Sequence, residues 1–469
     1  MLAALVSVVY LLASLLMAGH ALLNKRDSRS ALGWIACCLL VPLGFILYLI
    51  FGINRTRRSA REKRPQADDG GIPLNLSPAA PPVDFSLATI GYNITGKPLL
   101  PCNAIDVLVN GEQAYPNMLA AIASARRTVW LSTYIFANDD TGARFAQALV
   151  AAHERGIDVR IILDGMGEFM SLPRIGGKLR KLGLAVKRFN PLALIPPSLH
   201  LNMRNHRKLL AVDGKLAFTG GMNISGHHLV SDGSARHRVQ DLHFKFQGNI
   251  VADLEYAFLK DWDYCAHSSE AKDYQARDTV YPIGQSETAW TRLILDGPNE
   301  HMDKFADTLI GIISAAHSRI WIMTPYFHPD AEIIGALQAA KLRNIDVKIV
   351  LSAENNIRLS HWATFNLLWQ LLDYHVEIYY QPAPFSHTKL LLADSQYSLI
   401  GSANIDPRSI RLNFELGVEI FSSALNARLH AYFEDRITKA RRLYSQDLAQ
   451  RSLSVRIRDA LAWLLTPYL

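Results

Sequence analysis

A histidine, a lysine and an aspartate recur at one fixed spacing in two places in this 469-residue chain. The first copy, residues 205–223, reads NHRKLLAVDGKLAFTGGMN, and the second, residues 386–404, reads SHTKLLLADSQYSLIGSAN. Each contains H-x-K-x4-D and continues into a glycine turn and an asparagine. A lone histidine near a lysine is usually a surface pair, but recurrence in one register indicates a shared function. The repeat supplies six catalytic candidates: His206, Lys208, Asp213, His387, Lys389 and Asp394.

Residues i and i+2 of a strand point to one face of the sheet, so each lysine is predicted to lie beside its histidine. The stretch Val212-Asp213-Gly214-Lys215 separates two apolar runs and predicts a hairpin turn. The two aspartates of the motif are therefore interpreted as residues that hold the frame of the motif rather than as reacting groups.

Two histidines and two lysines are suited to exchange at a phosphodiester. One histidine can attack phosphorus to form a phosphohistidine, while the other protonates the leaving alcohol and later deprotonates the incoming one. The lysines would hold the non-bridging oxygens, where negative charge concentrates in the transition state. Two ammonium groups supply this stabilisation, so neither a metal nor a cofactor is expected. Further hydrogen-bond donors to the phosphate are predicted at Asn223, Ser402 and Asn404.

The paired motifs resemble the HKD motifs of the phospholipase D superfamily. The resemblance implies that the two motifs meet in one site, and it favours His206 as the attacking group. It also implies that a carboxylate downstream of each motif orients a histidine. Asp241 in QDLHFKF and Glu415 in FELGVEI stand in such positions, each at the start of a predicted strand; the alternative is that both are ordinary exposed acids.

Two longer stretches, RNHRKLLAVDGKLAFTGGMNISGHH and GSANIDPRSIRLNFELGVEI, together with the N-terminal segment, are similar to bacterial membrane-anchored cardiolipin synthases. That similarity implies joining of two phosphatidylglycerol molecules into cardiolipin with release of glycerol. It implies a multi-pass protein of the bacterial inner (cytoplasmic) membrane with its catalytic domain in the cytoplasm. The sequence departs from the family pattern in two places: Gly221 occupies the position in the first motif that Ser402 has in the second, and the segment before the second motif, residues 381–386, is short. The resemblance therefore defines the site of the acceptor lipid less well than the catalytic residues.

The first 64 residues must position the catalytic part at a membrane if this resemblance holds. Residues 2–23 and 31–53 carry no charged side chain, and each would form a helix roughly 33 Å long, enough to cross a bilayer. A cleaved signal peptide is disfavoured because the first run lacks a basic start and is too long. Six Lys and Arg follow the second run and three lie in the link 24–30, which predicts both ends in the cytoplasm and the link outside.

The basic cluster after the second run is interpreted either as a topology signal alone or as a site for anionic headgroups. It accounts for most of the charge of the chain. The first 64 residues hold nine Lys and Arg against two Asp and Glu, so the remainder balances to zero despite the net charge of +7. A neutral catalytic body argues against a nucleic-acid partner.

The four cysteines form neither a disulfide framework nor a zinc spacing; they are Cys37, Cys38, Cys102 and Cys265. His227, His228 and His237 have no carboxylate or cysteine at ligand spacing, so no metal centre is predicted there.

The elements that must carry the motifs repeat as well. Residues 128–136 (TVWLSTYIF) match residues 319–327 (RIWIMTPYF), and IDVRIIL matches IDVKIVL. The predicted order in the first half is helix 116–126, strand 128–136, helix 142–155 and strand 158–164. In the second half it is helix 302–317, strand 319–327, helix 331–343 and strand 346–351. Such alternation predicts an α/β fold of mixed sheets flanked by helices.

The predicted architecture is therefore two tandem phospholipase D-like domains preceded by a transmembrane hairpin of two helices. The boundaries are 1–64 for the hairpin and basic cluster, 65–86 for a linker, 87–285 for the first domain and 286–469 for the second. Residues 456–469 predict an amphipathic helix that lies in the membrane interface or packs on the body. Residues 191–201 form an apolar lip beside the site or fill the core.

Three function classes fit these observations. The first is a lipid phosphatidyltransferase with phosphatidylglycerol and the membrane as partners. The second is a phospholipase D, another head-group transferase or a nuclease that uses the same site. The third is a membrane scaffold with a relic site, which the intact double motif disfavours. The sequence leaves open whether the site transfers the phosphatidyl group to an alcohol or to water. It also leaves open the acyl-chain preference and the oligomeric state.

Overall fold

The computed structural model describes residues 2–24, 28–38, 44, 48, 83–191, 203–231, 237–274, 289–298 and 303–466. The chain divides into two compact units, Met1–Arg64 and Pro65–Leu469. The predicted linker and the predicted boundary at 285/286 fall largely or wholly outside the described residues, as do the basic cluster and residues 192–201 of the apolar lip.

The N-terminal unit contains two described helices that pack on each other, α1 (Leu2–Asn24) and α2 (Ser28–Cys38). The hydroxyl of Ser14 donates a hydrogen bond to the Cys38 carbonyl oxygen at 3.1 Å. Within the described residues, no helix combines the length and the apolarity needed to cross a membrane. The two predicted spans are therefore not confirmed; the second is described continuously only to Cys38.

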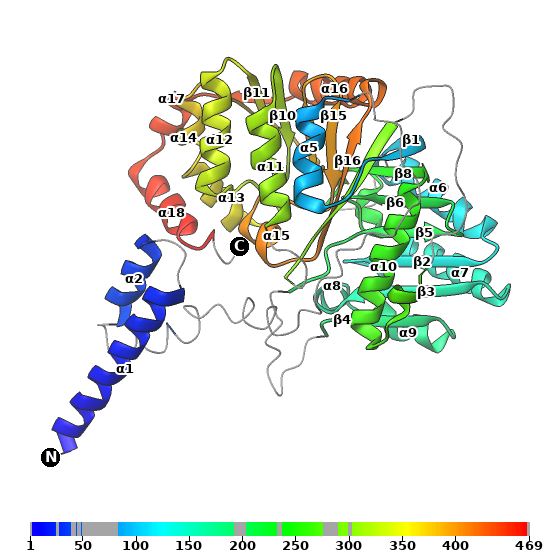
Figure 1. The fold of residues 1–469 in the computed structure, drawn as a ribbon, viewed down its shortest axis with the longest axis horizontal. Helices are drawn as coiled ribbons and strands as arrows, with labels where there is room; N and C mark the ends of the chain where they lie inside the picture. Colours follow the sequence, from blue (N-terminus) through cyan, green and yellow to red (C-terminus); the bar gives the residue numbers. More distant parts are fainter. Residues whose placement is uncertain are drawn as a thin grey trace. The chain divides into compact units, whose positions relative to one another are not determined.

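The second unit is built from two related runs of elements (Figure 1). The first run comprises α5 (Phe85–Thr95), β1 (Leu100–Val109), α6 (Asn110–Ser124), β2 (Thr128–Thr133), α7 (Asp140–Glu154), β3 (Asp158–Asp164), α8 (Gly165–Met170), α9 (Ile175–Lys181), β4 (Ala185–Phe189), β5 (Leu209–Val212), β6 (Leu216–Gly220), β7 (Val239–Gln240), β8 (Leu242–Gly248) and α10 (Ile250–Ala266).

The second run begins with β9 (Ala289–Asp296), α11 (Lys304–Ala315), β10 (Arg319–Met323), α12 (Ala331–Leu342), β11 (Asp346–Ser352), α13 (Arg358–Phe365), α14 (Trp369–Leu372) and β12 (Glu377–Gln381). It continues with β13 (Phe385–Ser386), β14 (Leu390–Ala393), β15 (Tyr397–Gly401), α15 (Pro407–Arg411), β16 (Glu415–Phe421), α16 (Ser423–Thr438), β17 (Arg441–Leu443), α17 (Ser445–Ala449) and α18 (Leu453–Trp463).

One continuous sheet joins the two runs. Its strand order is β17-β12-β11-β10-β14-β15-β16-β9-β1-β8-β6-β5-β2-β3-β4, so the order of one half mirrors that of the other about β9 and β1. Strands β2, β3 and β4 pair in parallel, as do β10, β11 and β12, while the strands nearer the middle pair antiparallel. The predicted mixed α/β fold with two related halves is confirmed.

The hydrophobic core also crosses from one half to the other. One cluster contains Trp130 of the first half and Trp321 of the second together with α10 and α16 residues such as Phe258 and Phe433. On the remaining helices, α6, α7 and α9 enclose a core of the first half, and α5, α11, α12 and α14 enclose a core of the second. The two halves thus share one part of the hydrophobic core.

Each H-x-K-x4-D motif ends in a hairpin whose aspartate binds backbone. Asp213 and Gly214 both have positive φ, at 57° and 67°, which suits a tight turn between β5 and β6. The Asp213 carboxylate accepts hydrogen bonds from the amides of residues 126–128 at 2.7–2.9 Å. Asp394 accepts likewise from the amides of residues 317–319. Both lie at the end of their strand away from the histidine, a position that suits residues that hold the frame of the motif.

Asp213→Ala is expected to lower the free energy of unfolding by about 2 kcal/mol, because three amides lose a charged acceptor and only partly regain water. Denaturant unfolding of this variant, with the exposed Asp373→Ala as control, measures the loss. Turnover at a temperature where the variant is folded should stay within about threefold of the parent, since a frame-holding residue leaves the reacting groups in place. A hundredfold fall in turnover would make Asp213 a reacting group.

Several predicted element boundaries are wrong, and the backbone at each end shows why. Strand β2 ends at Thr133 rather than at 136, because the Ile135 amide turns away to donate to the side chain of Asn223 at 3.1 Å. Helix α6 begins at Asn110 and contains Pro116 inside it, since Asn110 adopts a φ of 57° and turns the chain directly from β1 into the helix.

Helix α18 begins before the predicted start at 456 and is amphipathic. It packs on α13, and it buries Asp459 and Ala462. Its opposite side exposes leucine and isoleucine side chains. Packing on the body therefore accounts for one face of this helix.

Candidate active site at the junction of the two halves

The histidine and lysine of each motif lie in extended segments just before a strand, not within it as predicted. His206 and Lys208 precede β5, and His387 and Lys389 precede β14. They are held there because each segment pairs with backbone of the other half. The His206 amide donates to the Phe414 carbonyl at 2.9 Å. The His387 amide donates to the Gln240 carbonyl at 2.8 Å, next to the parallel pairing of β13 with β7.

These pairings place each histidine against a carboxylate of the opposite half. His206 Nδ1 lies 3.1 Å from the Glu415 carboxylate and 3.1 Å from the Ser402 carbonyl oxygen. His387 Nδ1 lies 2.9 Å from Asp241 Oδ2. Both carboxylates are fully buried. Sequence reasoning singled out the two acids, but the crosswise pairing could not be read from it.

The lysines are bound next to the histidines. Lys208 Nζ donates to the His206 carbonyl oxygen at 2.6 Å, and Lys389 Nζ donates to the His387 carbonyl oxygen at 2.5 Å. Lys389 Nζ also lies 3.0 Å from His387 Nδ1. On the first half the ring of Tyr134 lies 5.3 Å from the His206 ring and 5.6 Å from Lys208 Nζ.

Burial sets the electrostatics of this cluster. It lowers the pKa of Lys208 to about 7 and that of Lys389 to about 8, against the opposing pull of nearby carboxylates. It also raises the pKa of Asp241 to about 6. Burial would raise the pKa of Glu415, but the charge and hydrogen bond of His206, with Lys208 and Ser402, hold it at about 2. The buried lysines therefore gain from an anion placed between them.

The pKa of each histidine is lowered, which favours the neutral form at neutral pH. For His206 the main cause is burial, which Glu415 opposes. For His387 burial acts together with the positive charges of Lys389 and Lys208, and its pKa falls well below the usual value. A neutral imidazole has the lone pair that attack or proton abstraction requires.

We expect kcat/KM to fall as pH rises through about 7 to 8, because Lys208 and Lys389 lose their charges as the pH passes their pKa values. A pH–rate profile measures this limb. Lys208→Arg and Lys389→Arg should move the limb upward, since a guanidinium stays protonated, although geometry lowers the absolute rate. An alkaline limb at the same pH in both arginine variants would show that these lysines do not set it.

The three predicted phosphate-binding residues have different surroundings. Ser402 Oγ donates to Glu415 at 2.5 Å, so it supports the carboxylate. Asn223 accepts from the Ile135 amide through its side-chain oxygen, which leaves its amide nitrogen as the donor. Asn404 Nδ2 lies 3.2 Å from Ser409 Oγ, and its Oδ1 is buried without a partner among the described residues. Ser402 is thus brought into the cluster as a supporting residue.

A buried polar network that sequence reasoning missed fixes the first motif. Arg207 donates to Asp261 at 2.7 Å and to the Glu415 carbonyl oxygen at 3.1 Å. The main-chain N–H of Asn205 donates to the Asp164 carboxylate at 2.9 Å, and its side-chain Nδ2 donates to the Asp261 carboxylate at 2.9 Å. One sequence feature could have indicated this network: the first motif has an arginine, Arg207, between its histidine and lysine, where the second motif has Thr388.

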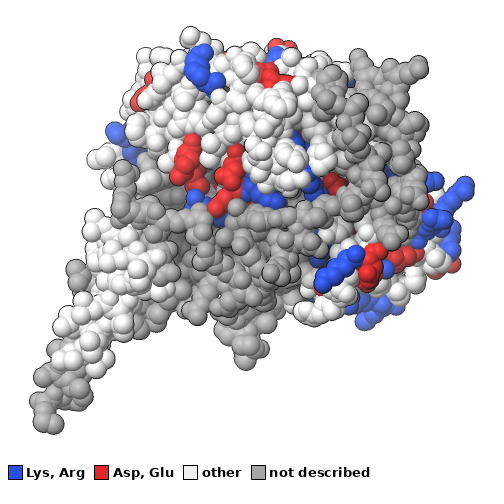
Figure 2. Space-filling model, in the orientation of Figure 1, with Lys and Arg blue, Asp and Glu red and all other residues white. Residues whose placement is uncertain are grey.

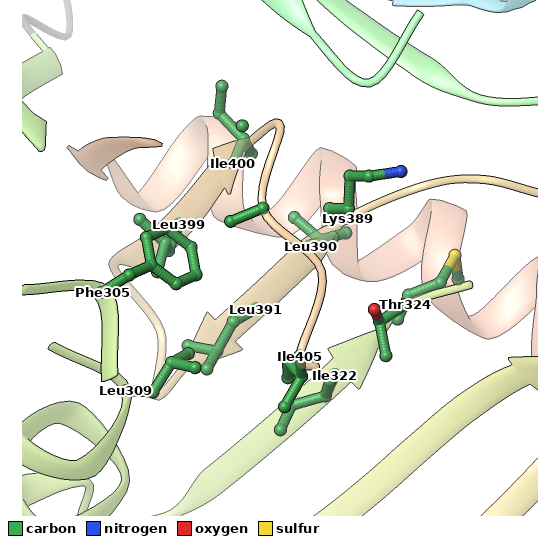
Figure 3. Close-up of a pocket in the computed structure, with 13 residues that line it drawn as sticks. Phe305, Leu309, Ile322, Thr324, Lys389, Leu390, Leu391, Leu399, Ile400 and Ile405 are labelled. Carbon is green, nitrogen blue, oxygen red and sulfur yellow. The ribbon is translucent and has the colours of Figure 1, made fainter. Parts of the chain in front are cut away.

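An apolar layer supports the second motif. A cavity of about 20 Å³ lies among core side chains including Phe305, Leu309 and Leu391, with Lys389 at its edge. Figure 3 shows the ammonium end of Lys389 extending away from these side chains. The cavity is too small and too apolar to hold a lipid headgroup and belongs to the core.

The histidines outside the motifs are placed differently. His227 is exposed, and His228 is buried against the Asn223 amide with its pKa lowered by burial to about 3. Among the described residues, the His, Cys and carboxylate side chains close enough to share a metal ion are Asp84, His317 and Asp394. They lie at the far end of β14 from Lys389, where Asp394 already binds backbone amides.

This fold and this double site define an enzyme of the phospholipase D superfamily. The solved structure of phosphatidylserine synthase from Haemophilus influenzae aligns with a TM-score of 0.63 and 14% identity, over 82% of this chain and 100% of that chain. The similarity shows a shared fold.

The family model described as cardiolipin synthase, PLD-like domain, matches residues 118–262 and 309–437, more than half of the chain, and the chain belongs to that family. A model described as phospholipase D-nuclease N-terminal matches residues 5–52. The major cardiolipin synthase ClsA of Bacillus subtilis is 29% identical over 95% of both chains. Cardiolipin synthase 1 of Bacillus anthracis is 29% identical over 95% of this chain and 90% of its own.

Proposed function

We propose that this protein is a phosphatidyltransferase that makes cardiolipin and glycerol from two phosphatidylglycerol molecules through a phosphohistidine intermediate. The observation that carries the proposal is the buried cluster of two histidines and two lysines, with each histidine held by a carboxylate of the other half. The relatives named as cardiolipin synthases, which align over 95% of this chain, supply the substrate class.

In the proposed reaction, His206 attacks the phosphorus of the first phosphatidylglycerol. Its Nδ1 faces two acceptors, Glu415 and the Ser402 carbonyl, so Nδ1 carries the proton and Nε2 has the free lone pair. As the nitrogen–phosphorus bond forms, the phosphorus–oxygen bond to glycerol breaks. His387 takes up a proton when the anionic phosphate offsets the positive charges of Lys389 and Lys208 around it, and it gives that proton to the departing oxygen.

The second half of the reaction reverses these roles. The hydroxyl of a second phosphatidylglycerol attacks phosphorus, His387 takes its proton, and the bond to His206 breaks to release cardiolipin. Lys208 and Lys389 bind the phosphoryl oxygens throughout and stabilise the charge of the transition state. Asp241 and Glu415 act as positioning residues for His387 and His206.

A phosphatidyl-enzyme can be resolved by water or by an alcohol, so transfer has to be favoured by positioning. Effective molarities of well-held reactants reach about 10⁵ M or more, which is sufficient for an alcohol to outcompete water. A site at a lipid surface would keep both the intermediate and the second anionic lipid in place. Phospholipase D activity or exchange with another headgroup alcohol is the alternative use of the same residues.

A nuclease is less well supported by the charges of the protein. On the face drawn in Figure 2, acidic and basic side chains of the described residues are interspersed rather than gathered into one basic stripe. Nucleic-acid binding depends on phosphate neutralisation by clustered Lys and Arg.

The assignment is tested with the purified full chain in mixed micelles that contain glycerol-labelled phosphatidylglycerol. We expect cardiolipin to accumulate with one glycerol released per molecule formed. Phosphatidic acid as the main product from the earliest times would make the protein a phospholipase and overturn the assignment.

For the N-terminal 64 residues we propose a multi-pass anchor in the bacterial inner membrane, with residues 2–23 and 31–53 as spans and the domains 87–285 and 286–469 in the cytoplasm. The two spans carry no charged side chain, and residues 5–52 match the N-terminal family model; both observations support this proposal. A cysteine at Ser28 should react with an impermeant reagent added to intact cells, and a cysteine at Ser59 should not. Labelling of the Ser59 position alone would reverse the orientation.

A further inference from the structure

A second cavity, with a volume of about 530 Å³, lies at the edge of the sheet beside α13, α17 and β17. None of the motif residues lines it. Its walls are formed by aromatic side chains of β12 and α13, and by a run of basic residues that follows α16. The volume is within the range of small-molecule sites and exceeds what a lone inorganic phosphate fills.

Positive charge dominates the walls of this cavity. Lys439, Arg441, Arg442 and Arg451 line it, against a single acid, Asp447. Each of these cations has a carboxylate partner, but those of Lys439, Arg442 and Arg451 (Asp435, Glu377 and Asp459) lie outside the lining. A guanidinium has five N–H donors, so one carboxylate leaves donors for an anion within the cavity.

A buried hydroxyl without a partner lies in the same wall. Tyr380 is 9% exposed, and its hydroxyl has no hydrogen-bond partner among the described residues. Its ring stacks on Phe365 with centroids 5.4 Å apart, which fixes its position. Burial raises the pKa of Tyr380, so the hydroxyl is a neutral donor. Buried polar groups in folded proteins are nearly always satisfied, which indicates a partner that is a bound molecule.

The structure assigns this cavity as a binding site for a phosphate ester, the glycerophosphate headgroup of an anionic phospholipid. The cations and the Tyr380 hydroxyl would bind the phosphate, and the Phe365 and His361 rings would cover the glycerol. A lipid source is favoured over a soluble one by α18, whose Asp459 pairs with Arg451 of the cavity. That helix exposes Leu453, Ile457 and Leu461, by 69%, 51% and 59%, on one stripe. The inference does not depend on the proposed reaction.

The test is hydrogen exchange of the full chain in neutral detergent micelles, followed in peptides that cover residues 439–451. Dihexanoylphosphatidylglycerol at about ten times its Kd should slow exchange there about tenfold. Dihexanoylphosphatidylcholine should have no effect, and sn-glycerol 3-phosphate distinguishes the source. Slowing by the lipid alone supports a headgroup site, and slowing by both supports a site for phosphate esters in general. Peptides over residues 203–212 report occupancy of the catalytic cluster separately.

Two variants and a control make the result specific. Tyr380→Phe removes only the unpaired hydroxyl, so the melting temperature should stay unchanged or rise while the slowing at residues 439–451 weakens at least fivefold. Arg442→Gln should weaken it similarly, and Arg180→Gln, an exposed cation on α9, should leave it intact. Absence of slowing with either phosphate ester, equal slowing by phosphatidylcholine, or slowing unchanged in both variants would overturn the assignment.

Discussion

His206→Ala and His387→Ala are each expected to lower turnover by about 10³-fold or more, because one variant lacks the nucleophile and the other lacks the acid and base. The expected loss is similar for both, since the two side chains act in one sequence of steps and their effects are not additive. Initial rates of cardiolipin formation from labelled phosphatidylglycerol measure it. The double variant should therefore be little slower than either single variant.

The matched control is His227→Ala, which removes an exposed histidine that contacts neither lysine and should retain full activity. Treatment of the parent with EDTA should also leave the rate unchanged, because the two lysines supply the positive charge. Substantial turnover in either motif variant, or a chelator loss that a divalent ion restores, would contradict the division of roles.

Glu415→Gln is expected to lower kcat by about 10²- to 10⁴-fold, because the histidine loses the charge that fixes its tautomer and stabilises its cationic forms. Removal of a nearby anion also disfavours the protonated imidazole, so the pKa of His206 should fall. The acid limb of the pH–rate profile should accordingly move to lower pH. A purely structural role would lower the rate without this displacement.

Glu434→Gln serves as the control for loss of a carboxylate, since the Glu434 side chain is 58% exposed. Thermal unfolding of Glu415→Gln identifies any contribution from misfolding, because the residue also faces Lys208. A rate within threefold of the parent, in a folded Glu415→Gln protein, would show that the crosswise contact with His206 is not used in the reaction.

Local sequence signals predicted the repeated strands well. Strand β3 has the bounds expected of it, and β11 ends one residue later, because these runs are rich in Val, Ile and Leu and lie within the sheet. The ends of β2 and β10 were misplaced since Phe136 and Phe327 are apolar too, yet each forms only an isolated bridge, to Ile224 and Ile405. A strand end set by such non-local contacts has no local pattern.

The candidate site was predictable as a set of residues and not as a geometry. Recurrence identified the histidines and lysines, and resemblance identified the two carboxylates. Their crosswise pairing depends on contacts such as His206 to Phe414, which link distant parts of the chain. The same holds for Arg207 and Asp261, whose pairing is invisible without the fold. Periodicity reports which face a residue occupies but not which distant element covers that face.

The crosswise pairing has a consequence for how activity arises as the chain folds. Contacting groups of the site are 209 residues apart for His206 and Glu415, and 146 residues apart for His387 and Asp241. Contacts of such long range form late, since the intervening chain must be ordered first. Helices and the local hairpins can therefore be complete while both histidines still lack their partners. A partly folded chain would carry every reacting group and yet be inactive. The two histidines become reactive only when the two halves have come together and each histidine contacts its carboxylate partner.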